Sequence, residues 1–188
     1  LLEVIRRTGI ELPTFCYYSE LSVYGACRMC MVEVVGSRKL TAACSTVVWE
    51  GMEVITDSKK VYDAQTGVLD LILSDHKTNC LSCARNGSCE LQALCRRFNR
   101  LHPELPDISS DEPLRIDNPS IVRDPAKCVK CGRCVKDCPG YILELDKEHD
   151  ETPHVIEAYK RECWHCGNCR ISCPHQAVSF EFPLYTLV

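Results

Sequence analysis

Cysteine is the residue type that carries the chemistry of this chain. The sequence has 188 residues, of which 16 are cysteine, and nearly every cysteine lies two or three residues from another. Disulfides usually join cysteines that are distant in sequence in small secreted domains, so this close spacing favours metal binding instead. Fifteen cysteines and one histidine form four groups, and only Cys95 is left over. The groups are Cys16, Cys27, Cys30 and Cys44; His76, Cys80, Cys83 and Cys89; Cys128, Cys131, Cys134 and Cys138; and Cys163, Cys166, Cys169 and Cys173.

The last two groups have the most specific spacing. Each reads C-x2-C-x2-C-x3-C-P, the bacterial ferredoxin pattern for [4Fe–4S] clusters, in which the fourth cysteine of one run binds the cluster of the other run. A zinc site would take paired C-x2-C units with no proline-marked fourth cysteine, so zinc is disfavoured here. We therefore predict two [4Fe–4S] clusters, with Cys128, Cys131, Cys134 and Cys173 on cluster A and Cys138, Cys163, Cys166 and Cys169 on cluster B.

The two runs are also an internal repeat, CVKCGRCVKDCP and CWHCGNCRISCP, offset by 35 residues. β-prone stretches flank the first run at 120–123 and 141–145, and the second at 154–158 and 177–182. A strand–loop–helix–strand unit used twice predicts a ferredoxin-like domain with one cluster in each half. Gly132 and Gly167 suit the tight turns beside the sulfur atoms. The aromatic residues Tyr141, Trp164 and Phe180 are predicted to fill the core around the clusters.

The first group has a different setting. Ten residues separate Cys16 from Cys27, which makes a long loop, and Gly25 allows that loop to turn. Alternation predicts a strand over 30–35, a hairpin turn over 36–38 and a return strand over 39–44. Residues 1–8 predict the end of an amphipathic helix closing at Gly9. A helix on a small sheet with a cysteine-bearing loop is the arrangement of β-grasp [2Fe–2S] ferredoxins, with zinc as the alternative because these gaps are less diagnostic.

The second group follows a predicted helix over 60–74. A cubane needs four ligands and the group supplies three thiolates, so His76 or Cys95 must provide the fourth. A lone histidine is more often a surface or capping residue, and Cys95 falls in a predicted helix where a structural thiol is ordinary. The spacing leaves the choice open.

Three stretches match a known family: GIELPTFCYYSELSVYGACRMCMVEV, DHKTNCLSCARNGSCELQ and PSIVRDPAKCVKCGRCV. Through them, residues 1–137 resemble the N-terminal relay module shared by [FeFe] hydrogenases, the large iron–sulfur subunit of respiratory NADH dehydrogenase and NAD-linked formate dehydrogenases. The resemblance implies [2Fe–2S] binding by the first group and [4Fe–4S] binding by His76 with the three cysteines of the second. That family opens with a β-hairpin before its first helix, so the resemblance also implies residues upstream of Leu1.

From Cys138 onward the chain looks like dicluster ferredoxin subunits such as the β subunit of adenylylsulfate reductase. The predicted fold is therefore α+β, with three domains and one linker. They are a β-grasp [2Fe–2S] domain over 1–57 without its N-terminal hairpin, a short helical His/Cys-ligated [4Fe–4S] domain over 58–103, a proline-rich linker over 104–124, and a ferredoxin-like 2[4Fe–4S] domain over 125–188.

No terminal active site stands out in the sequence. The hydrogenase active-site cysteine motifs, a molybdopterin domain, a Gly-rich phosphate loop and a nucleophile elbow are all missing, so no catalytic residue and no flavin or nicotinamide site is predicted. We predict a multi-cluster electron-transfer subunit that relays single electrons between a catalytic partner, of flavoprotein, hydrogenase or formate dehydrogenase type, and another carrier. The alternatives are a relay fragment of a longer catalytic chain such as an [FeFe] hydrogenase or formate dehydrogenase and, more remotely, a zinc-binding structural module.

The net charge and the hydropathy of the sequence restrict the kinds of partner that the chain can bind. The net charge is −4 and no basic cluster is present, which argues against nucleic acid. No run of about 20 apolar residues exists for direct membrane insertion. Loaded clusters make the chain more negative, so we expect it to dock on basic patches of other subunits of an oxidoreductase complex, including a flavoprotein. So many thiolates imply a reducing compartment, the cytoplasm of an anaerobe.

Overall fold

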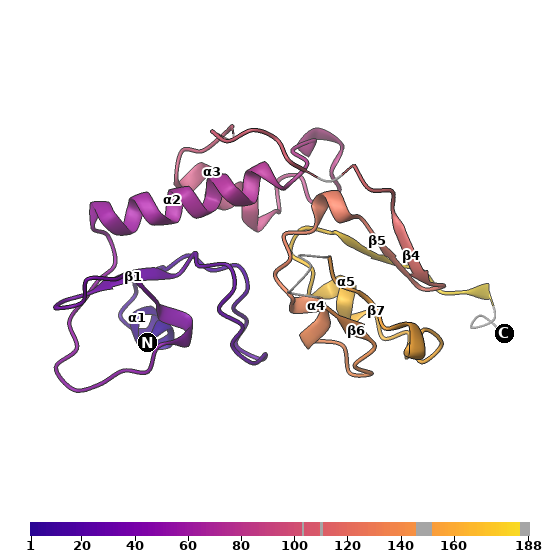
Figure 1. The fold of residues 1–188 in the computed structure, drawn as a ribbon, viewed down its shortest axis with the longest axis horizontal. Coiled ribbons are helices and arrows are strands. Elements are labelled where there is room, and N and C mark those ends of the chain that lie inside the picture. Colours follow the sequence, from indigo (N-terminus) through magenta and orange to yellow (C-terminus); the bar gives the residue numbers. More distant parts are fainter. Residues whose placement is uncertain (103, 110, 146–151, 185–188) are drawn as a thin grey trace.

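A computed structural model describes residues 1–188 except 103, 110, 146–151 and 185–188. It is a small α+β structure with short strands and one long helix (Figure 1). The helices are α1 (Leu2–Arg7), α2 (Lys59–Ser74), α3 (Glu90–Arg97), α4 (Arg133–Lys136) and α5 (Asn168–Ile171). The strands are β1 (Met31–Val34), β2 (Thr41–Ala42), β3 (Val54–Ile55), β4 (Arg115–Asn118), β5 (Ile121–Arg123), β6 (Leu143–Glu144), β7 (His154–Val155) and β8 (Val178–Phe180).

The N-terminal part is an antiparallel sheet in the order β2-β1-β3 with α1 packed against it. Burial alternates along β1, because Val32 and Val34 point inward, as the alternating sequence predicts. Leu2 and Ile5 of α1 join Val32 in one apolar core. The predicted return strand over 39–44 is shorter than expected, since the chain turns into a 3₁₀ helix at Ala43–Ser45 directly after β2.

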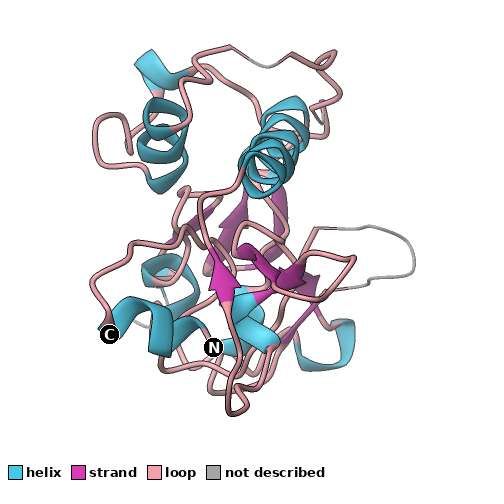
Figure 2. Ribbon diagram, turned by 90° about the vertical axis from the view of Figure 1, so that its left-hand side faces the viewer, coloured by secondary structure: helices cyan, strands magenta, loops and turns pink. Residues whose placement is uncertain are grey.

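Helix α2 begins at a side-chain cap, where the Ser58 hydroxyl accepts a hydrogen bond from the Val61 backbone N–H. Its apolar face, including Leu69 and Leu73, packs with Phe15 from the N-terminal loop and Leu91 from α3. Figures 1 and 2 show α2 and α3 together above the strands. No helix among the described residues is long and apolar enough to cross a membrane.

The C-terminal part contains a three-stranded sheet, β4-β5-β8, and a two-stranded sheet, β6-β7. The 35-residue repeat of the sequence is visible in its backbone. Gly132 and Gly167 both have φ of +73° and cap the N-termini of α4 and α5. Lys130 and His165, the same distance apart, have φ of +51° and +55°. The two halves therefore bend their cysteine loops in the same way.

Two expectations need correction in this part. Strands β4 and β5 lie inside the predicted linker over 104–124, and β5 pairs with β8 in the C-terminal sheet. The β-prone stretch predicted at 120–123 is confirmed as β5, so its assignment to the linker was wrong: Ile121 and Arg123 are buried on one side of β5, which makes it part of the core. The aromatic residues Tyr141 and Trp164 are 77% and 68% exposed rather than in the core.

Specific contacts join the C-terminal part to the rest of the chain. The buried Arg133 guanidinium of α4 donates to the Glu90 carboxylate of α3 and to the backbone carbonyl of Tyr17, each at 3.4 Å. The Lys77 backbone N–H, just beyond α2, donates to the carbonyl of Ala126 at 2.9 Å. These contacts fix how the cysteine-bearing loops of the different parts face one another.

Candidate metal centres

The first group of cysteines gathers where the loop after α1 meets the sheet. Cys16 Sγ lies 3.4 Å from Cys27 Sγ, and the hydrogen bond between them lowers the pKa of Cys16 to about 5 while raising that of Cys27. Burial and, next in size, the neighbouring Cys30 thiol together raise the pKa of Cys44 to about 12. The four thiols thus form two pairs. Two pairs of cysteine ligands are what the two irons of a [2Fe–2S] cluster take.

The local fold explains these pairs. Cys30 immediately precedes β1 and Cys44 follows β2, and the antiparallel register Met31↔Ala42 brings these two strand ends together. Gly25 has φ of +69°, which lets the loop turn back toward the sheet. A β-carbon at Gly25 would lie 3.9 Å from Ser45, so the turn passes close to the Cys44 segment.

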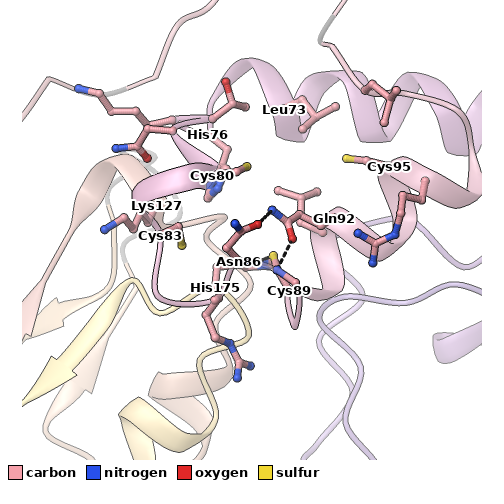
Figure 3. A pocket seen from close by; sticks show the side chains of 18 of the residues that line it. Leu73, His76, Cys80, Cys83, Asn86, Cys89, Gln92, Cys95, Lys127 and His175 are labelled. Atoms are coloured by element: carbon pink, nitrogen blue, oxygen red, sulfur yellow. Dashed lines mark hydrogen bonds between the residues drawn. The ribbon is translucent and has the colours of Figure 1, made fainter.

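The second group lines a pocket of about 450 Å³ under α2 (Figure 3). His76 follows the end of α2, Cys80 opens a short 3₁₀ turn, and Cys89 caps the N-terminus of α3. The ring atom Nδ1 of His76 is buried and has no hydrogen-bond partner among the described residues. Burial lowers the pKa of His76, which keeps the imidazole neutral and leaves a nitrogen free to bind metal.

Cys95 lines the same pocket from α3, facing it from the side opposite His76 and Cys80 (Figure 3). Burial raises the pKa of Cys95 to about 11, and the nearby Cys89 and Cys80 thiols add to the rise. The pocket therefore holds both candidates for a fourth ligand that the spacing left open.

His175 is a pocket residue that the sequence reasoning missed. Its Nδ1 lies 3.7 Å from Cys89 Sγ, and its ring packs against the rings of Phe15 and His76 at centroid distances of 5.4 and 5.9 Å. A signal was present in the repeat, because His175 occupies the position held by Gly140 in the first copy. This departure from the repeat, a large ring in place of glycine directly after a Cys-Pro pair, is the signal that could have drawn attention to the position.

In the C-terminal part, Cys173 faces the first run. Burial raises the pKa of Cys131 to about 12 and that of Cys134 to about 11, and Cys173 adds to both shifts. Burial also raises the pKa of Cys128 to about 12, with Cys134 and Cys131 contributing. The thiols of the predicted set A therefore lie in one another's electrostatic range.

Cys138 faces the second run instead. It lines a small, mostly apolar pocket together with Cys163, Cys166 and Cys169. Burial raises the pKa of Cys163, and the Cys138 and Cys166 thiols raise it further. The fourth cysteine of each run is thus placed beside the other run.

Each group supplies the number of ligands that one iron–sulfur cluster takes. All 16 cysteines are free thiols. Among the residues that the structure describes, no three His, Cys, Asp or Glu side chains are close enough to hold one metal ion. A [2Fe–2S] or [4Fe–4S] cluster is held by four side chains, mostly cysteine thiolates and in some proteins histidine. The three all-cysteine groups, and the group of three cysteines with the unpartnered His76 Nδ1, fit that number and type of ligand.

Comparison with known protein families divides the chain in the same way as the cysteine groups. Residues 1–59 match a 2Fe-2S iron-sulfur cluster binding domain. Residues 65–104 match the NADH-ubiquinone oxidoreductase-G iron-sulfur binding region. Residues 127–177 match a 4Fe-4S dicluster domain. The chain therefore contains one 2Fe-2S domain and 4Fe-4S domains.

Several known proteins are similar over nearly the whole chain. An NADH-quinone oxidoreductase subunit of Rhizobium meliloti is 32% identical over 97% of this chain and 22% of its own length. The NADP-reducing hydrogenase subunit HndD of Solidesulfovibrio fructosivorans is 34% identical over 95% of this chain and 33% of its own length. The alpha subunit of the NADPH-Fe(3+) oxidoreductase of Geobacter sulfurreducens is 31% identical over 93% of this chain and 21% of its own length. The chain thus spans about a fifth to a third of the length of these relatives.

The fold is also found in a solved structure. A chain of the NAD+-reducing [NiFe]-hydrogenase, in its H2-reduced state, superposes with a TM-score of 0.85 over 96% of this chain and 80% of that chain. The two sequences are 22% identical, so the match concerns the fold alone.

Proposed function

We propose that this chain, which carries the iron–sulfur electron-transfer module of NADH-quinone oxidoreductase- and hydrogenase-type complexes, relays single electrons between a catalytic partner and a second carrier. The partner is a flavoprotein, a hydrogenase or a formate dehydrogenase type of subunit in the same complex. The observation that carries the proposal is the gathering of four groups of cysteine and histidine side chains at separate, adjoining places in one small fold.

Each group is proposed to hold one cluster, giving one [2Fe–2S] and three [4Fe–4S] clusters that supply one-electron redox chemistry. The first group binds through its two thiol pairs, and His76 completes the second group. The protein's own part is to bind, to bury and to tune these clusters. The proposed ligands are Cys16, Cys27, Cys30 and Cys44; His76, Cys80, Cys83 and Cys89; Cys128, Cys131, Cys134 and Cys173; and Cys138, Cys163, Cys166 and Cys169.

The proposed domains follow this division. A β-grasp domain occupies residues 1–57, a helical domain residues 58–103 and a ferredoxin-like 2[4Fe–4S] domain residues 125–188. Strands β4 and β5 favour extending the last domain upstream to include residues 115–123. The short helices α4 and α5, each opened by a left-handed glycine, support the ferredoxin-like assignment.

The contacts of His175 support a relay between neighbouring sites. His175 lies two residues beyond Cys173, and its ring packs against Phe15, the neighbour of Cys16. The same ring approaches Cys89 of the second group. The first group, the second group and set A therefore all come close to this one side chain, while cysteines of set B share an apolar core with cysteines of set A.

A reductive titration of the full chain, purified without oxygen, tests this function. About four one-electron equivalents per chain should be taken up, with EPR signals from one [2Fe–2S] and three [4Fe–4S] centres. Uptake of fewer than two equivalents would contradict a relay. The many thiolates also lead us to propose a reducing, cytoplasmic setting.

A second candidate is that this chain is the relay part of a longer catalytic polypeptide. The observation that favours it is the small share of each relative that the chain covers. The length of the intact gene product decides between a separate subunit and a fused relay.

A further inference from the structure

Arg123 is the least expected residue of the C-terminal core. It is the last residue of β5, the central strand between β4 and β8, where it pairs with Val178. The residue is 1% exposed, and its three guanidinium nitrogens make no well-formed hydrogen bond among the described residues, although they come near enough to the Cys134 thiol to lower its pKa. The carboxylate of the neighbouring Asp124 does not form an ion pair with Arg123, because it pairs with Lys127 at 3.0 Å.

A buried guanidinium without partners is strongly unfavourable. Arginine stays protonated in proteins, so this side chain cannot escape the cost of burial by losing its charge. An isolated buried charge strongly destabilises the folded state unless an opposite charge compensates it. The fold must therefore provide negative charge close to Arg123 in its working state.

Cysteines from both proposed sets lie in the core beside Arg123. Arg123 shares a face of β5 with Ile121 and pairs with Val178, and both of these residues belong to the buried core that contains Cys134 and Cys169. Its charge lowers the pKa of Cys128 and Cys134 of set A, and of Cys169 of set B, against the larger effect of burial. Cys134 and Cys169 are the second residues of α4 and α5, the two helices that the repeat relates. Arg123 thus acts on both halves of the repeat from one central position.

We propose that Arg123 is a counter-charge shared by the two C-terminal cluster sites, placed so that it favours the reduced state of both. The inference rests on the proposed ligand sets A and B. Reduction adds one negative charge to a cluster, and a buried cation nearby stabilises that charge because little water screens it. Arg123 therefore raises the reduction potentials of both clusters and weakens the repulsion between two reduced neighbours.

The test is an EPR-monitored redox titration of the anaerobically prepared full chain. Arg123→Met removes the charge and keeps an apolar stem, while Arg123→Lys keeps the charge. Arg170→Met is the matched control, because Arg170 directly follows Cys169 but is exposed. We expect both C-terminal midpoint potentials to move negative in R123M, to stay closer to wild type in R123K, and to stay unchanged in R170M. The [2Fe–2S] potential serves as an internal reference and should not move.

Wild-type potentials in R123M would overturn the proposal. If R123M loses about eight irons, the content of two [4Fe–4S] clusters, R123K decides the matter. If R123K keeps the iron that R123M loses, the positive charge is what the site requires, and the proposal is supported. If R123K loses the iron as well, the shape of the guanidinium is what matters, and the counter-charge role is contradicted. A wild-type chain without any C-terminal cluster signal would instead contradict the ligand sets themselves.

Discussion

His175 Nδ1 lies 3.7 Å from Cys89 Sγ, although 86 residues separate the two in sequence. Burial lowers the pKa of His175 to about 3, so the ring is neutral at pH 7 and carries one N–H. Its Nε2 is buried without a hydrogen-bond partner among the described residues, which favours the proton on Nδ1, where it can be donated to the Cys89 sulfur. Hydrogen bonds to ligand sulfur are one of the means by which a protein raises a cluster potential.

Replacing His175 with Phe should therefore lower the midpoint potential of the cluster in the His76 pocket. The ring volume is kept and only the donor is lost, so a shift of tens of millivolts is expected, where about 59 mV equals about 1.4 kcal/mol for one electron. His102→Ala is the control, since His102 lines the same pocket but is exposed. A redox titration in which H175F and H102A both match wild type would refute the donor role.

Substituting His76 and Cys95 one at a time decides which of them is the fourth ligand. If His76 is the ligand, Cys95→Ser leaves the iron content unchanged while His76→Ala destabilises or removes one [4Fe–4S] cluster. His76→Cys should keep the cluster and lower its potential, because a thiolate adds a negative charge that opposes reduction. Loss of about four irons in C95S, measured by iron analysis, would instead make Cys95 the ligand.

The two glycines that cap α4 and α5 form a matched pair for a stability test. Both have φ of +73°, where an alanine costs about 1–2 kcal/mol. A β-carbon at Gly132 would lie 3.4 Å from the Tyr24 ring, an ordinary van der Waals distance, and one at Gly167 would meet no described atom within 4 Å, so the backbone cost is the shared effect. We therefore expect both alanine variants to lose their visible cluster absorbance at lower guanidinium chloride concentrations than wild type, and by similar amounts. Wild-type behaviour of both variants would contradict the backbone argument.

Local signals predicted the features that depend on neighbouring residues. The Ser58 cap and the apolar period of α2 are local, and so is the alternation along β1. The repeat predicted that the two C-terminal loops are alike, which Gly132 and Gly167 bear out through their shared φ of +73°. These features follow from steric and periodic rules that act within a few residues.

Features that depend on long-range contact were not predictable in the same way. Strand β4 was not predicted within the proline-rich stretch, and the β-prone residues 120–123 were predicted without a partner, because only the pairing of β5 with β4 and β8 makes a core sheet of them. The approach of His175 to Cys89 and the burial of Arg123 each depend on packing between distant segments. Spacing could place the cysteines in groups, but it could not show which other side chains share their pockets.

The central claim is that these thiols and one imidazole hold iron–sulfur clusters that conduct electrons. Its most direct test is elemental and sulfide analysis of the full chain prepared without oxygen, together with EPR of the reduced protein. About fourteen irons per chain are predicted, the sum of one [2Fe–2S] and three [4Fe–4S] clusters, with a matching amount of acid-labile sulfide. Stoichiometric zinc in a colourless sample, disulfide bridges among the cysteines, or far fewer irons would contradict the account.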